Sequence, residues 1–125
     1  MIDPEVVKVR DSITGMAMVL DLLAEEGRPL SALVADLPAL AMVKEKRDLS
    51  SIGGRSAVQE VLAAVRSTFA DGQVNDLDGV RVDLAEGWVH VRPSNTEPIV
   101  RVIAEADTKD QAEALVARVT QAANL

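Results

Sequence analysis

The stretch VRVDLAEGWVHVRPSNTEPIVRVIAEA, residues 80–106, decides the fold of this chain. Its first five residues alternate between aliphatic and charged side chains, which is the period-two pattern of a half-buried strand. Two more apolar runs, Trp88–Val91 and Ile99–Ala104, follow after short polar connections. Because parallel neighbours need long crossovers, three strands joined this closely are predicted to be largely antiparallel.

Helical patterns flank these three strands on both sides. Ser56 with Gln59 predicts a capping box before one helix, and Thr108 with Gln111 predicts another before the last helix. An extended segment precedes the first of these helices, and its charged run Lys44–Asp48 is typical of a solvated edge strand. The predicted fold class is therefore α+β: a two-layer module with a four-stranded, mainly antiparallel sheet and two helices on one face.

The beginning of the chain is predicted to be mostly helical. Apolar residues recur at three- and four-residue steps up to the stop signal at Gly27, and Ser31 is predicted to cap a short second helix. Pro38 closes this part, so we expect a boundary between residues 1–38 and residues 39–125. Helices with wide apolar stripes and no sheet of their own should pack on the C-terminal module, self-associate or fray.

Composition excludes several classes of function. Twenty acidic against 13 basic residues give a formal charge of −7, and aromatic residues make up 2% of the chain, so nucleic acid is not an expected partner. No cysteine is present, which excludes thiolate nucleophiles. His90 is the single histidine, and no serine shows a paired His-Asp constellation with it, so a serine hydrolase is not expected. No stretch is apolar enough to span a membrane, so we expect a cytoplasmic chain without a membrane partner. We also expect no metal or cofactor in this chain, since no second His or Cys accompanies the single histidine.

The loop between the last two predicted strands contains the residues best suited to bind an anion. They are the candidate phosphate-binding residues of this sequence: Arg92, Ser94, Asn95, Thr96 and Arg101. Arginine offers a charged fork that matches phosphate oxygens, hydroxyl groups donate hydrogen bonds, and a tight turn can direct backbone N–H groups inward. Prolines at both margins would preorganise the loop. From residue types alone, an ordinary polar turn is an equal alternative.

The same letters resemble the C-terminal, TBP-like domain of the α-D-phosphohexomutases. RPSNTEP at 92–98 follows DGVRV at 78–82 and GWVHV at 87–91, and it precedes IVRVIAE at 99–105. That family includes phosphoglucomutases, phosphomannomutases and phosphoglucosamine mutases, which interconvert sugar 1-phosphates and 6-phosphates through a bisphosphorylated sugar. The resemblance implies contacts of the loop residues with the phosphate that is not transferred: Arg92, Ser94, Asn95 and Thr96, with Arg101 as a neighbour.

The resemblance also covers the earlier part of the chain. RDS at 10–12, GRPLS at 27–31 and MVKEK at 42–46 resemble the end of the third and the start of the fourth domain of these isomerases. Residues 39–125 would then be the phosphate-binding fourth domain, and residues 1–38 a helical remnant of the third.

In that family the phosphoserine, magnesium and sugar-reading loops belong to other domains, so this chain is expected to bind and not to catalyse by itself. The implied partners are a hexose phosphate and the remaining domains of the full-length enzyme, with magnesium required only there. The alternative is a free-standing α+β module that binds a small metabolite or another protein. In that case the helices of residues 1–38 would serve for self-association.

Overall fold

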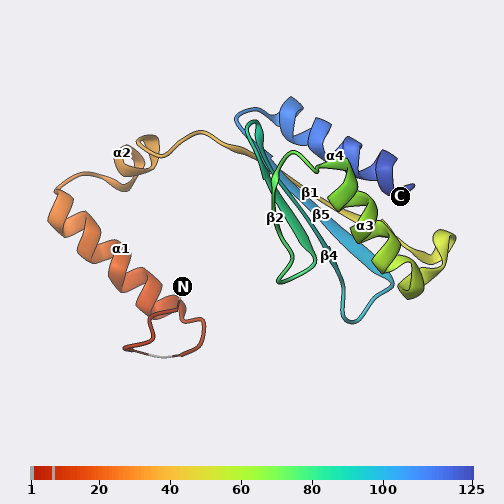
Figure 1. Ribbon diagram of the computed structural model, residues 1–125. Helices are drawn as coiled ribbons and strands as arrows, with labels where there is room; N and C mark the ends of the chain where they lie inside the picture. The colour runs from red at the N-terminus through yellow and green to blue at the C-terminus, as the bar shows by residue number, and fades with distance from the viewer. Residues whose placement is uncertain (1, 7) are drawn as a thin grey trace. The chain divides into compact units, whose positions relative to one another are not determined.

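A computed structural model describes residues 2–6 and 8–125 of the chain. The chain divides into two compact units, Met1–Pro38 and Ala39–Leu125 (Figure 1). The C-terminal unit contains a sheet and two α-helices, whereas the described part of the N-terminal unit contains two α-helices and no strand.

The C-terminal unit is built on one five-stranded sheet in the order β1-β5-β4-β3-β2, in which every pair of neighbours is antiparallel. Its strands are β1 (Ala41–Asp48), β2 (Gln73–Asn75), β3 (Val80–Leu84), β4 (Gly87–Pro93) and β5 (Ile99–Ala106). The predicted α+β fold with an antiparallel sheet is confirmed, but the predicted count of four strands is wrong. The additional strand, β2, has three residues, too few to show an alternating pattern, and it forms by pairing with the edge of β3.

Two helices cover one face of this sheet, α3 (Val58–Thr68) and α4 (Lys109–Ala123) (Figure 1). The valines that face them from β3, β4 and β5 are fully buried: Val80, Val82, Val89, Val91, Val100 and Val102. Phe69, directly after α3, is among the largest fully buried side chains of this core. The other face of the sheet carries the intervening polar and charged residues, and we call it the open face.

The two predicted capping boxes have different outcomes. Thr108 and Gln111 form the predicted reciprocal box at the start of α4. Ser56 forms no box with Gln59, because two short 3-10 turns, η1 (Ser50–Ile52) and η2 (Gly54–Ala57), lead into α3 and its N-terminal residue is Val58. The Ser56 hydroxyl instead donates to the carbonyl of Gly53 at 2.7 Å.

The N-terminal unit contains α1 (Ser12–Glu26) and α2 (Leu30–Ala35). Asp11 caps α1, and hydrogen bonds from the Thr14 hydroxyl and from two backbone N–H groups hold the pKa of its carboxyl below the usual value. The predicted stop at Gly27 is confirmed, with the glycine in the left-handed conformation at φ 63°. The predicted Ser31 cap is wrong, because Pro29 occupies the cap position of α2.

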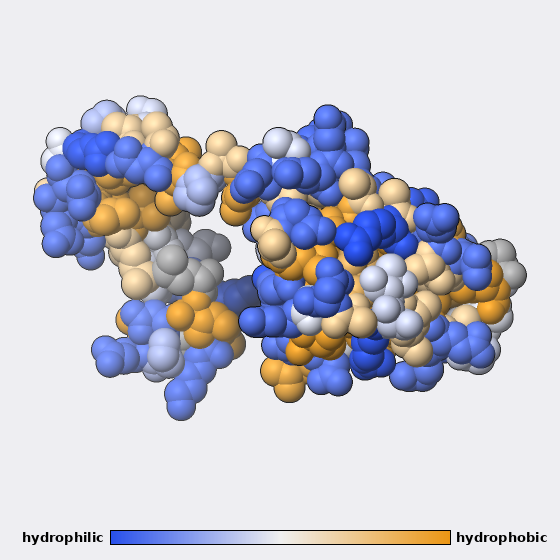
Figure 2. All heavy atoms as spheres, turned by 45° about the horizontal axis from the view of Figure 1, so that its top comes forward, coloured by the Kyte–Doolittle hydropathy of each residue, from blue (hydrophilic) through white to orange (hydrophobic). Residues whose placement is uncertain are grey.

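None of the residues of α1 and α2 is buried. Apolar side chains on α1 are exposed instead, among them Ile13, Met16 and Leu20, and Figure 2 shows hydrophobic groups at the surface of this unit. A shallow apolar groove runs along α1 to Leu30. Within residues 2–6 and 8–125, no helix is long and apolar enough to cross a membrane.

Candidate functional site

The loop between β4 and β5 is closed by backbone hydrogen bonds at its base. The Ser94 N–H donates to the carbonyl of Ile99 at 2.9 Å, so the two strands remain paired up to the first loop residue. On the far side, the Leu49 N–H donates to the carbonyl of Pro98 at 2.9 Å and ties the end of the loop to the segment after β1. The loop is therefore anchored to both of its neighbouring segments.

Inside the loop, two backbone N–H groups point at one oxygen. The N–H groups of Thr96 and Glu97 donate to the Ser94 hydroxyl oxygen at 3.4 and 3.3 Å, and the Thr96 hydroxyl lies 3.4 Å from the same atom. These bonds are long, so the donors are only weakly satisfied. This is the pattern of a Ser/Thr turn, and N–H groups that converge in this way can also bind an anion, because a phosphate oxygen is a stronger acceptor than a hydroxyl.

A side chain from outside the loop fixes its tip. The Arg55 Nη2 donates to the Asn95 carbonyl at 2.8 Å across 40 residues of sequence. Arg55 lies in η2, the turn that precedes α3, and it is exposed. It adds a positive charge beside the loop and restrains the backbone at Asn95. Nothing in the sequence pattern indicated this role, because the contact depends on how β1 and β5 pair.

Arg92 lies on β4, two residues before the loop, and points to the open face because its neighbour Val91 is buried on the other. Its Nη1 lies 2.9 Å from the Asp78 Oδ2, while its Nε is buried without a hydrogen-bond partner. A guanidinium has five donors in a rigid fork, and this one satisfies few of them within the described part of the chain. Arg92 therefore has donors to offer to a ligand.

The strand register brings Arg101 beside Arg92. The two arginines are directly opposite each other in the β4–β5 pair, and Arg101 is exposed on the open face. Like charges in opposing positions destabilise a sheet, so this pairing favours an anionic ligand. All five predicted site residues thus lie on or next to the junction of β4 and β5.

Asp78 and its turn support Arg92 from the side of β3. The Asp78 carbonyl oxygen lies 2.6 Å from His90 Nε2, which holds this turn on β4. Gly79 follows at φ 77°, and a Cβ atom built on it would collide with the Val91 carbonyl and the Arg92 backbone. Neither contact can be read from the sequence, because both depend on how the turn before β3 packs on β4.

We expect Gly79→Ala to destabilise the protein more than Gly54→Ala does. Both glycines have a left-handed φ, 77° and 64°, but Gly54 has no atom within 4 Å of the position of a Cβ. Gly54→Ala should thus lose only about 1–2 kcal/mol of unfolding free energy from backbone strain, whereas Gly79→Ala adds a collision. Urea unfolding measures both, and equal losses would contradict the close packing of the turn on Arg92.

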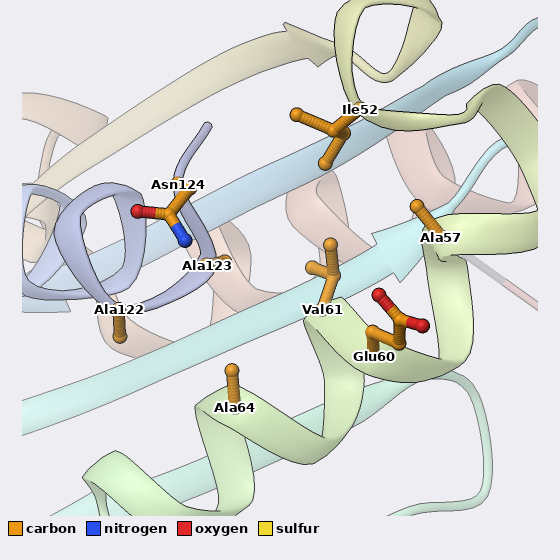
Figure 3. A pocket seen from close by; sticks show the side chains of 8 residues that line it. All are labelled: Ile52, Ala57, Glu60, Val61, Ala64, Ala122, Ala123 and Asn124. Carbon is orange, nitrogen blue, oxygen red and sulfur yellow. The ribbon is translucent and has the colours of Figure 1, made fainter.

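A separate hollow lies in the helical layer, between α3, the end of α4 and the turns before α3 (Figure 3). Alanine and other aliphatic side chains line most of it, and Glu60 and Asn124 are its polar lining residues. It has no cationic group, so it does not fit an anion. Within the described residues, no group of three or more His, Cys, Asp or Glu side chains could hold a metal ion.

Comparisons with known proteins agree on one family. The model described as "Phosphoglucomutase/phosphomannomutase, C-terminal domain" matches residues 41–122. A "Probable phosphoglucosamine mutase" of Methanopyrus kandleri is 38% identical over 114 residues, which cover 91% of this chain and 25% of the relative. A "Phosphoglucomutase/phosphomannomutase" of Thermococcus kodakarensis is 31% identical over 112 residues, 90% of this chain and 24% of the relative.

A solved structure is similar as well. The phosphoglucomutase/phosphomannomutase family protein of Burkholderia thailandensis superposes with a TM-score of 0.53 at 25% sequence identity, over 75% of this chain and 20% of that protein. The chain spans about a quarter of the length of the curated relatives that it matches.

Proposed function

The chain belongs to the phosphoglucomutase/phosphomannomutase family and contains its C-terminal domain, and from this premise we propose that residues 92–98, the end of β4 and the loop after it, bind a phosphate group of a hexose phosphate. In the full-length enzyme this is the phosphate that is not transferred while the other end of the sugar reacts. The full-length protein interconverts hexose 1-phosphates and 6-phosphates, as an isomerase of carbohydrate metabolism. This domain binds substrate and does not react with it.

The observation that carries the proposal is the convergence of two backbone N–H groups on the Ser94 hydroxyl oxygen, in the loop that directly follows the end of β4, on which Arg92 lies. A phosphate oxygen placed at that point would accept from both N–H groups, while the serine hydroxyl turns to donate. Arg92 would supply paired donors from β4, and Arg101 would add positive charge from β5. Asn95 and Thr96 would complete the ring of donors from the loop itself.

Holding one phosphate accelerates the reaction without touching the bond that changes. A fixed phosphate orients the sugar, and reorientation of the sugar would present its other end to the phosphoserine of another domain. Magnesium, which the family requires, would act in that other domain by neutralising charge on the transferring phosphoryl group. No step in the present domain passes through a metal.

For residues 1–38 we propose an origin in the preceding domain of the full-length enzyme. The match with the Methanopyrus relative covers 114 residues and so continues beyond the residues 41–122 of the C-terminal domain model. The exposed apolar stripe of α1, which contains Ile13, Met16 and Leu20, is what a helix shows when its own sheet is missing. The remaining domains of the enzyme are then the partners of this unit.

We expect Ser94→Ala to weaken the binding of glucose 1-phosphate by about tenfold or more, because hydrogen bonds to charged groups contribute about 1.5–3 kcal/mol. Isothermal titration calorimetry on the present chain measures the change. Ser67→Ala is the matched control, because Ser67 is exposed on α3 in the helical layer. Equal affinities of the two variants, or equal binding of free glucose, would contradict the proposed function.

A further inference from the structure

Three cationic side chains lie in one row across the open face of the sheet. The register puts Lys46 of β1 directly opposite Arg101 of β5, and Arg101 directly opposite Arg92 of β4. The three strands are neighbours in the order β1-β5-β4 (Figure 1). Directly opposite residues of antiparallel strands share a face, so Lys46 belongs to the same face as the two arginines.

This row contains more positive charge than its surroundings neutralise. Arg92 has Asp78 as a partner, but no ion pair of Lys46 or of Arg101 is found among the described residues. The acidic residue that follows on this face of β1 is Asp48, and its Oδ1 accepts from the Ser50 N–H at 2.7 Å. Hydrogen bonds from Ser50 lower the pKa of the Asp48 carboxyl, so it stays charged but is already engaged with the start of η1.

Lys46 and Arg101 also border the same hollow on the open face. Its lining also includes Lys44 and Ile103, which are directly opposite each other in the next row of the β1–β5 pair, and Glu45, which is already paired with Arg47. Lys44 thus has the same charge, strand and face as Lys46 but has an aliphatic partner. Opposed cations lower the stability of a sheet, and a bound dianion would remove that repulsion.

We propose that Lys46 is a third cationic residue of the phosphate site, reaching it from the edge strand. This inference rests on the proposed function and extends the site from β4 and β5 to β1. Lys46 supplies a compact positive charge to the phosphate oxygens that face away from the loop, while Arg92 supplies the planar fork. The charged run Lys44–Asp48, predicted from sequence as a solvated edge, does lie on the edge strand β1, but its two lysines have different roles.

The test compares Lys46→Gln with Lys44→Gln in the present chain, with glucose 1-phosphate as the probe. Both variants lose one charge from the same strand, so their effects on net charge are equal. We expect Lys46→Gln to weaken binding by about fivefold to tenfold and to reduce the dependence of affinity on salt concentration. Lys44→Gln should change affinity by less than about twofold.

A second readout needs no ligand. At low ionic strength Lys46→Gln should raise the midpoint of thermal unfolding above that of Lys44→Gln, because it removes the repulsion from Arg101. If the wild type binds and both variants bind equally, the role of Lys46 is overturned while the proposed function stands. If the wild type itself does not bind glucose 1-phosphate, the proposed function fails and the role of Lys46 fails with it.

Discussion

Replacing Arg92 with alanine is expected to lower kcat/KM of the full-length mutase by a factor of about 30 to several thousand. This range corresponds to about 2–5 kcal/mol, which is the loss on truncating one partner of a desolvated charge pair. The effect should be large because Arg92, at the end of β4, pairs only with an exposed aspartate among the described residues, and because the partner that remains is a doubly charged phosphate. Steady-state kinetics with a hexose 1-phosphate measures it.

Arg66→Ala provides a matched control for this experiment. The side chains of Arg66 and Arg92 are both 40% exposed, and each pairs with an aspartate that is itself 69% or 65% exposed, respectively. Arg66 lies on α3, away from the open face. Its replacement should leave kcat/KM within about twofold, since a surface ion pair contributes little. Unchanged kinetics in Arg92→Ala, or equal losses in both variants, would rule out the assignment of the phosphate site.

Replacing Phe69 with alanine is expected to lower the free energy of unfolding by about 3–5 kcal/mol. Phe69 is 0% exposed, and the Arg118 guanidinium lies 4.3 Å from the centre of its ring. Removing the ring leaves a cavity between α3 and α4, and it also removes the stacking of Arg118. Because small domains have about 5–15 kcal/mol of stability in total, this loss is a substantial part of the whole.

Leu77→Ala is the control for Phe69→Ala, because Leu77 is 93% exposed in the turn before β3. Its replacement should change the free energy of unfolding by less than about 0.5 kcal/mol. Urea unfolding followed by circular dichroism measures both variants. A loss below about 1 kcal/mol for Phe69→Ala would mean that the core described here does not hold the sheet and helices together.

Most of the fold could be predicted because its strands are long and half-buried. Alternation at Val80, Val82 and Leu84 reports directly on which side of β3 is buried. The three residues of β2 are too few for such a signal, so that strand could not be found without its neighbour. The capping box predicted at Ser56 is wrong for a different reason. Gly53 is in the left-handed conformation, and the Ser56 hydroxyl donates to the Gly53 carbonyl instead of capping a helix. The Ser-x-x-Gln spacing alone does not reveal this competing hydrogen bond.

The candidate site was only partly visible in the sequence. Residues within the loop are contiguous, so Ser94 and Thr96 could be selected from their chemistry alone. Arg55 contacts the loop across 40 residues, and Asp78 reaches Arg92 from the turn before β3. Such contacts depend on strand register and on the turns between elements, which no local pattern encodes. The proposed role of Lys46 also depends on strand register, because only its position opposite Arg101 distinguishes it from Lys44.

The most direct test of the central claim is a titration of the isotopically labelled chain with glucose 1-phosphate, followed by backbone amide NMR, with free glucose as the control. We predict saturable, phosphate-dependent shifts at the backbone N–H groups of Arg92, of residues 94–97 and of Arg101. The N–H groups of Thr96 and Glu97 should move most, because they would exchange the Ser94 hydroxyl for a phosphate oxygen. No shift at high millimolar ligand, or the same shifts with glucose, would contradict a phosphate site in this loop.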